Sequence, residues 1–236
     1  AFRSLLKSRG AAFGVVLTLG VAIGANTAIF SVVEGVLLSP LPYPNEDRIV
    51  RVAATTYETP TSRGDRGNTF SDRGYWHFVN NNRSFEKFGG YSAGTQALPL
   101  TGDGSPRQVR RGGMTLNAFE VLGVLPELGR LPAPEEDAPN GALVVLLSHE
   151  LWMSQYGGDP AILGRIITLD GTPREVIGVM PASFDFPAPD AELWTPTRLD
   201  PASTNFGGHY IMAIGRLAPG VTIEAAVALA RSLVAR

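Results

Sequence analysis

Three histidines, His77, His149 and His209, are the side chains of this 236-residue chain best suited to bind a metal ion or transfer a proton. A zinc site needs paired ligands at short spacing, as in HExxH, where both histidines share one helix face. Here the histidines lie far apart, and His149-Glu150 lacks a second histidine four residues after the first. The chain has no cysteine, so thiolate metal sites and disulfides are excluded. We therefore predict no metal site.

Other chemical motifs are incomplete. Residues 135–137, Glu-Glu-Asp, offer carboxylates to calcium but lack EF-hand spacing, so we expect a solvated loop there. No GxSxG nucleophile elbow occurs, and Gly20–Gly24 lacks the lysine of a phosphate-binding loop. Trp76, Trp152 and Trp194 are expected to pack in the core or between subdomains. The sequence thus predicts no catalytic residue and no cofactor.

The most informative element is an uncharged run over residues 10–33, which three basic residues and no acidic one precede. As a helix these residues would be about 36 Å long, enough to cross a hydrocarbon core of about 30 Å. The apolar pattern continues to residue 38. We predict a transmembrane helix over 10–38, after a cytoplasmic N-terminus over 1–9, because positively charged ends stay inside.

Two alternatives compete with a permanent membrane anchor. A cleaved signal sequence has a shorter apolar region of about 7–15 residues and ends in small residues, and Ala22-Ile23-Gly24 could serve as its cleavage site. A buried helix of a soluble protein rarely lacks charge over such a length. The length of the run favours the anchor.

Small residues within the run predict helix packing. Gly20 and Gly24 have GxxxG spacing, which lets helix backbones approach closely in lipid. Asn26 is the one strongly polar residue well inside the span, and facing lipid it would be costly. We predict that Gly20, Gly24 and Asn26 contact neighbouring membrane helices.

The rest of the chain is mildly acidic. The chain has 20 basic and 22 acidic residues; with three basic residues before the span, 17 basic and 22 acidic residues follow, a net charge of −5. This balance argues against a nucleic-acid surface. No second stretch approaches 18 apolar residues, so we expect a single membrane crossing.

Alternating prolines mark the exit from the membrane. Pro40, Pro42 and Pro44 favour an extended, stiff segment, and we predict a rigid stalk over 39–47. A proline-rich recognition motif is the rival interpretation. Beyond residue 47 strand and helix patterns interleave, which favours an α/β or α+β domain.

Local signals place the elements of this domain. Strand patterns cover residues 49–53, 91–100, 109–114, 143–147, 166–169, 175–179 and 209–217. Helix caps are expected at Ser71, Asn117, Ser148 and Thr222, with a helical turn at Asp159-Pro160. Asp170-Gly171 is a strong hairpin signal, and residues 55–69 have the composition of an exposed loop.

Several motifs in order along the chain closely resemble a MacB/FtsX-type ABC transporter permease. They are GANTAIFSVV at 24–33, PLPYP at 40–44, VLGV at 121–124 with Gly129-Arg130, YGGDP at 156–160, LDG at 169–171, VIGVMP at 176–181 and LAPGVT at 217–222. Together these motifs cover nearly the whole chain. Within the family, the sequence is similar in character to the large duplicated permeases of acidobacteria.

The resemblance implies an α+β fold: one transmembrane helix followed by a two-lobed, mixed α/β periplasmic domain. A porter-like lobe would comprise 48–124 and 202–236, with a strand-rich lobe inserted over 125–201. This chain also departs from MacB. MacB carries a nucleotide-binding domain before its first membrane helix, whereas nine residues precede the uncharged run here. The three further membrane helices of the family are also missing, so we expect a permease fragment.

The function implied by the resemblance is non-catalytic. Movement driven by ATP hydrolysis in the cytoplasm would pass through the helix to the periplasmic lobes, for export or substrate extraction at the bacterial inner membrane. The implied partners are the lipid bilayer, the other membrane helices of the permease, an ABC ATPase subunit, and a second permease half or a second copy; nucleic acid is excluded. A single-span periplasmic sensor or binding module is the alternative, and an anchored enzyme is the weakest rival.

Overall fold

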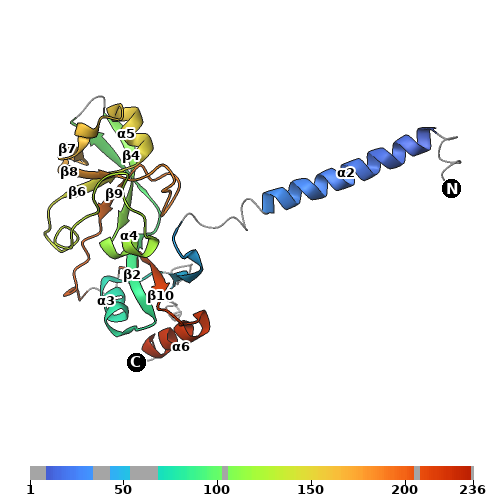
Figure 1. Ribbon diagram of the computed structural model, residues 1–236. Helices are drawn as coiled ribbons and strands as arrows, with labels where there is room; N and C mark the ends of the chain where they lie inside the picture. Colours follow the sequence, from blue (N-terminus) through green and yellow to red (C-terminus); the bar gives the residue numbers. More distant parts are fainter. Residues whose placement is uncertain (1–8, 34–42, 54–68, 103–105, 205–207, 235–236) are drawn as a thin grey trace. The chain divides into compact units, whose positions relative to one another are not determined.

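The computed structural model describes residues 9–33, 43–53, 69–102, 106–204 and 208–234 (Figure 1). The chain divides into two compact units, residues 1–42 and 43–236, and each is described by itself. Three predictions fall largely outside the described residues: the N-terminus over 1–9, of which 1–8 are not described, the stalk residues Pro40 and Pro42, and the loop over 55–69, of which 55–68 are not described.

The first unit contains one long helix, α2 (Arg9–Val33). Within it, Phe13–Ser31 has a mean hydropathy of 1.9 and is long and apolar enough to cross a membrane. The side chains described there are exposed, as a lipid-facing helix requires. The expected helix is therefore confirmed over residues 9–33, and its predicted end over 34–38 lies outside the described residues.

The second unit mixes strands and helices, which confirms the predicted fold class. Its elements are η2 (Glu46–Arg48), β1 (Ile49–Val52), α3 (Asp72–Asn81), β2 (Phe85–Ser92), β3 (Gln96–Thr101), β4 (Arg107–Met114), α4 (Leu116–Leu122), β5 (Leu128–Gly129), β6 (Val144–Leu147), α5 (His149–Tyr156), η3 (Pro160–Ile162), β7 (Ile166–Leu169), β8 (Thr172–Val179), β9 (Leu193–Pro196), β10 (Ile211–Leu217) and α6 (Ile223–Val234). The strands follow the order β1-β10-β2-β4-β3-β7-β8-β6-β9, and β5 adds to β8.

Helices cover both faces of the part of the sheet formed by β1, β10 and β2. Two adjacent glycines of β2 identify the helix on each face, because neighbouring residues of a strand point to opposite faces of the sheet. A Cβ on Gly89 would lie 2.2 Å from the backbone nitrogen of Ala118, so α4 packs directly on that face. A Cβ on Gly90 would lie 3.1 Å from the ring of Tyr75, so α3 packs on the other. The aromatic cluster under α3 also includes Ala230 of α6.

Six of the remaining strands close into a ring, and β5 pairs with β8 outside it. Because β9 pairs with β4 in parallel as well as with β6, the path β4-β3-β7-β8-β6-β9 returns to its start and forms a six-stranded barrel. Its interior is the apolar cluster that includes Val109, Leu147, Ile167, Val176 and Leu193, each fully buried. The barrel gives this part of the domain its own core.

Short-range signals in the sequence are confirmed. Ser71 Oγ accepts a hydrogen bond from the Gly74 nitrogen at 3.2 Å, and Ser148 Oγ accepts one from the Leu151 nitrogen at 3.0 Å. Asp170-Gly171 forms the β7–β8 hairpin, whose last pair is Leu169 with Thr172. β6 is buried along its whole length, as its apolar run predicts.

Two local predictions were wrong. The cap of α4 is Thr115, whose Oγ1 accepts from the Ala118 nitrogen at 3.3 Å, rather than Asn117. The strand expected over 91–100 is two strands, β2 and β3, because Gly94 adopts φ 84° and turns the chain between them. The turn at Gly94 thus interrupts what looks in the sequence like one continuous strand.

The two-lobe division stays a prediction. Strands β3 and β4 precede Leu125, yet they share the barrel and its core with strands that follow it. Strand β10, from after Pro201, pairs with β1 and β2, as the interrupted porter-like lobe requires.

Candidate functional site

The structure keeps the three histidines apart. His77 lies on α3 beside Asn81, His149 on α5 pairs with Glu127, and His209 Nδ1 lies 3.1 Å from a backbone carbonyl oxygen. In the part of the chain that the structure describes, no group of three or more His, Cys, Asp or Glu side chains could hold a metal ion.

The acidic loop is not simply solvated, which corrects one expectation. Asp137 is partly buried, and burial raises the pKa of its carboxyl group. Its oxygens accept from the backbone nitrogens of Leu116 at 2.7 Å and Arg198 at 3.1 Å. Glu136 pairs with Arg130. Asp137 therefore joins the loop to the start of α4 and to the segment after β9.

The predicted helix-packing residues lie on two sides of α2. At about 100° per residue, Gly20 and Gly24 share one face, whereas Asn26 points about 160° away from Gly24. Among the described residues, nothing lies within 4 Å of the Cβ position of either glycine. Two separate neighbours would be needed to cover both faces.

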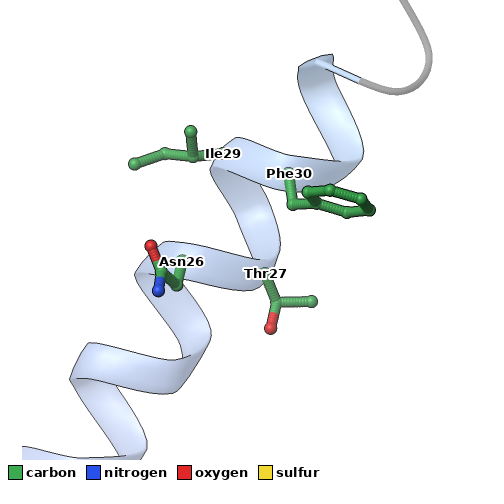
Figure 2. A pocket seen from close by; sticks show the side chains of 4 residues that line it. All are labelled: Asn26, Thr27, Ile29 and Phe30. Carbon is green, nitrogen blue, oxygen red and sulfur yellow. The ribbon is translucent and has the colours of Figure 1, made fainter. Parts of the chain in front are cut away.

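A shallow hollow on α2 surrounds Asn26. It is lined by Asn26, Thr27, Ile29 and Phe30 (Figure 2). Thr27 Oγ1 donates to the Ile23 carbonyl at 2.9 Å, so this hydroxyl is satisfied within the helix. The Asn26 amide has no hydrogen-bond partner among the described residues. It is the polar group of this surface that still requires a partner in a membrane.

Arg216 of β10 binds the segment that precedes β1, at the start of the second unit. Arg216 is 7% exposed, and its guanidinium donates to three carbonyl oxygens. These belong to Pro44 at 2.7 Å, Asn45 at 3.1 Å and Val121 of α4 at 2.5 Å. One cation therefore holds the segment before β1, strand β10 and helix α4 together.

A second arginine, Arg48, lies in the segment before β1 and binds the end of β10. Arg48 Nε donates to the Leu217 carbonyl at 2.9 Å, and its guanidinium also pairs with Glu86 of β2. We call Arg48, Arg216 and the carbonyls that they bind the arginine clasp. Because Leu217 ends β10, the clasp joins the segment before β1 to the segment that leads into α6.

Sequence reasoning missed both arginines of the clasp. A signal was present for Arg216, which interrupts the apolar strand Ile211–Leu217. A charged residue in a buried strand is almost always paired. Its partners could not be read from the sequence, because Pro44 and Val121 lie 172 and 95 residues away from it.

Comparisons with known proteins agree with this architecture. A family model described as the MacB-like periplasmic core domain matches residues 12–233. A search of curated proteins found no match. The family that matches is one of periplasmic core domains, and no enzyme family is indicated.

Three solved structures have a similar fold. The periplasmic region of MacB from Actinobacillus actinomycetemcomitans aligns with a TM-score of 0.57 and 17% identity, over 79% of this chain and 82% of that one. The extracellular domain of the noncanonic ABC-type transporter YknZ from Gram-positive bacteria aligns with a TM-score of 0.57 and 15% identity, over 78% and 92%. A domain of a putative permease protein from Porphyromonas gingivalis aligns with a TM-score of 0.57 and 19% identity, over 81% of each chain.

The family match spans most of the chain, and the apolar helix and mixed domain follow in the order expected for a membrane-associated transporter component. The chain therefore belongs to the family of MacB-like periplasmic core domains of ABC transporter permeases.

Proposed function

We propose that this chain couples ATP hydrolysis in the cytoplasm to a conformational change of its periplasmic domain, for export or substrate extraction. In this proposal α2 is the first membrane helix of the permease, with its N-terminus in the cytoplasm, and the ATPase is a separate subunit or domain. The permease works with a second half or a second copy. No catalytic step is assigned to this chain.

The arginine clasp is the observation that carries the proposal. A displacement of the stalk reaches the domain at Tyr43–Arg48, where Arg216 and Arg48 bind it to β10. Both arginines are in rigid strand or helical backbone, and β10 pairs along its length with β1 and β2. A flexible connection would dissipate such a movement, whereas these hydrogen bonds pass it to β10, the strand between β1 and β2.

The stalk supplies the first test. Replacing Pro40, Pro42 and Pro44 together by glycine is expected to reduce transport by the complete permease severalfold, because glycine makes the segment flexible. Membrane insertion, which depends on the apolar helix, should be unchanged. Transport and coupled ATPase activity are measured in membrane vesicles.

The matched control replaces three exposed prolines elsewhere, Pro134, Pro139 and Pro219, by glycine. Unchanged transport in the stalk variant would show that stiffness of the stalk is not needed. Reduced transport in both variants would point to general destabilisation instead. A single-span sensor, the alternative function, predicts no coupled ATPase activity at all.

The helix residues supply a second test. Gly20, Gly24 and Asn26 are proposed to contact other helices of the permease. Replacing Asn26 by leucine should lower the apparent melting temperature of the detergent-solubilised permease by about 1–2 °C, since one interhelical hydrogen bond is worth about 0.6–1.7 kcal/mol. Thr27→Val is the control, because its hydroxyl already bonds within α2. Equal melting temperatures for both variants and the wild type would argue that Asn26 faces no partner helix.

A further inference from the structure

One mouth of the barrel gathers positive charge. Arg111 follows buried Val109 by two residues in β4, and Arg174 precedes buried Val176 by two residues in β8. Since strand residues two apart share a face, both arginines point to the interior side of the barrel. Thr195, two residues after buried Leu193, follows the same rule.

Strand directions bring these residues to the same end. β4 and β9 are parallel, β9 is antiparallel to β6, and β6 is parallel to β8. The later residues of β4 and β9 therefore lie at the same end as the earlier residues of β8. Arg198 follows β9 there, in a left-handed conformation with φ 52°. We call Arg111, Arg174, Thr195, Thr197 and Arg198 the cationic mouth.

The polar groups of the cationic mouth are poorly satisfied. Arg111 Nε, Arg174 Nε and Thr197 Oγ1 are buried, and none has a hydrogen-bond partner in the part of the chain that the structure describes. Arg111 Nη1 reaches Thr195 Oγ1 at 3.2 Å, and Arg198 Nη1 reaches a carbonyl at 3.3 Å. Among the described residues, neither Arg111 nor Arg174 forms an ion pair. Buried donors without partners are costly, so the arrangement requires something else to stabilise it.

The charges also repel one another. Burial lowers the pKa of Arg111 and of Arg174, and the charges of Arg198 and Arg111 lower the pKa of Arg174 further. The carboxylate next to Arg198 is Asp137, but its oxygens are engaged by backbone nitrogens. By contrast, Arg107 and Arg110, on the same strand as Arg111, each pair with a carboxylate. Among the described residues, three arginines thus gather here beside Asp137, whose oxygens already accept hydrogen bonds from backbone nitrogens.

We propose that the cationic mouth is a binding site for a phosphate group, carried either by free phosphate or by a phosphorylated small molecule. Arginine forks match the oxygens of phosphate in paired hydrogen bonds, and threonine hydroxyls add neutral donors. A doubly charged anion also offsets the excess of arginine charge. Barrel mouths are frequent ligand sites because the strands hold their side chains rigidly. The site is separate from the arginine clasp and does not depend on the coupling function.

The test uses the whole chain in detergent, with inorganic phosphate and glycerol 3-phosphate as probes in calorimetric titrations at constant ionic strength. Saturable binding of at least one probe is expected. Arg174→Met should weaken it about tenfold or more, as expected for losing a charge-assisted hydrogen bond. Binding of both probes indicates a site for the phosphate group however it is carried, and binding of phosphate alone indicates the free anion.

Stability without phosphate gives a second readout. Removing an unpaired, repelled charge should leave Arg174→Met at least as stable as the wild type in phosphate-free buffer, whereas phosphate should raise the melting temperature of the wild type more than that of the variant. Arg83→Met removes an exposed cation and is the matched control, for which wild-type binding is expected. No saturable binding of either probe, or equal affinity in the wild type and Arg174→Met, would overturn the proposal.

Discussion

Replacing Arg216 by methionine is expected to lower the free energy of unfolding by about 3 kcal/mol and to abolish coupled transport. The side chain is 7% exposed, and its removal takes hydrogen bonds from the carbonyls of Pro44, Asn45 and Val121. Each buried polar group left unsatisfied costs about 1–3 kcal/mol, and water can reach part of the exposed stalk end. Urea unfolding followed by the fluorescence of buried Trp194 measures the change.

Two further variants distinguish the hydrogen bonds of the clasp from the effect of a positive charge alone. Arg216→Lys keeps the charge but lacks the planar fork, so it should recover only part of the stability. Arg51→Met, on the neighbouring strand β1, removes an exposed arginine and should change stability by less than about 0.5 kcal/mol. The clasp would be refuted as a structural joint if Arg216→Met and Arg51→Met were equally stable.

Replacing Gly89 by alanine is the second change with a large expected effect. The added Cβ would lie 2.2 Å from the Ala118 nitrogen and 2.3 Å from its Cα, so α4 must move away from the sheet. Such overpacking costs about 1–3 kcal/mol, and more where the neighbour is backbone. The shift would also displace Val121, whose carbonyl accepts from Arg216. We therefore expect lower stability together with reduced transport, measured by urea unfolding and in vesicles.

Gly113→Ala is the matched control for Gly89→Ala. Gly113 is also a buried strand glycine, but its Cβ would first meet Ser92 Oγ at 3.4 Å, an ordinary contact. Its stability should stay close to that of the wild type. Equal losses in the two variants would mean that the close approach of α4 at Gly89 does not limit the packing.

The parts of the fold that the sequence predicts are those decided by neighbouring residues. Ser71 and Ser148 cap helices because each hydroxyl reaches a backbone nitrogen three residues ahead. Asp170-Gly171 makes a hairpin because both residues adopt positive φ. The uncharged run of α2 needs only length and composition to be recognised.

The remaining features depend on residues that are distant in the sequence. The parallel pairing of Arg111 with Leu193 closes the barrel across 82 residues, and no local pattern indicates it. The position of Arg216 in an apolar strand indicates that it is paired, but its partners Pro44 and Val121 are too distant in the sequence to be recognised from it. Arg111 and Arg174 become neighbours only through that closure, so the candidate sites were less predictable than the fold class.

The position of β10 has a consequence for the order in which the domain can fold. The barrel uses strands from one continuous stretch, Gln96 to Pro196, whereas β10 lies between β1 and β2 and is made last. As the chain is made, the stretch that forms the barrel can close while β1 and β2 still lack the strand between them. Pairing of Ile49 with Arg216 also joins the two strands of the domain that are farthest apart in the sequence. Contacts between residues so far apart in the sequence form slowly during folding. The arginine clasp is therefore completed only after residue 217 has emerged, when the rest of the domain can already be in place.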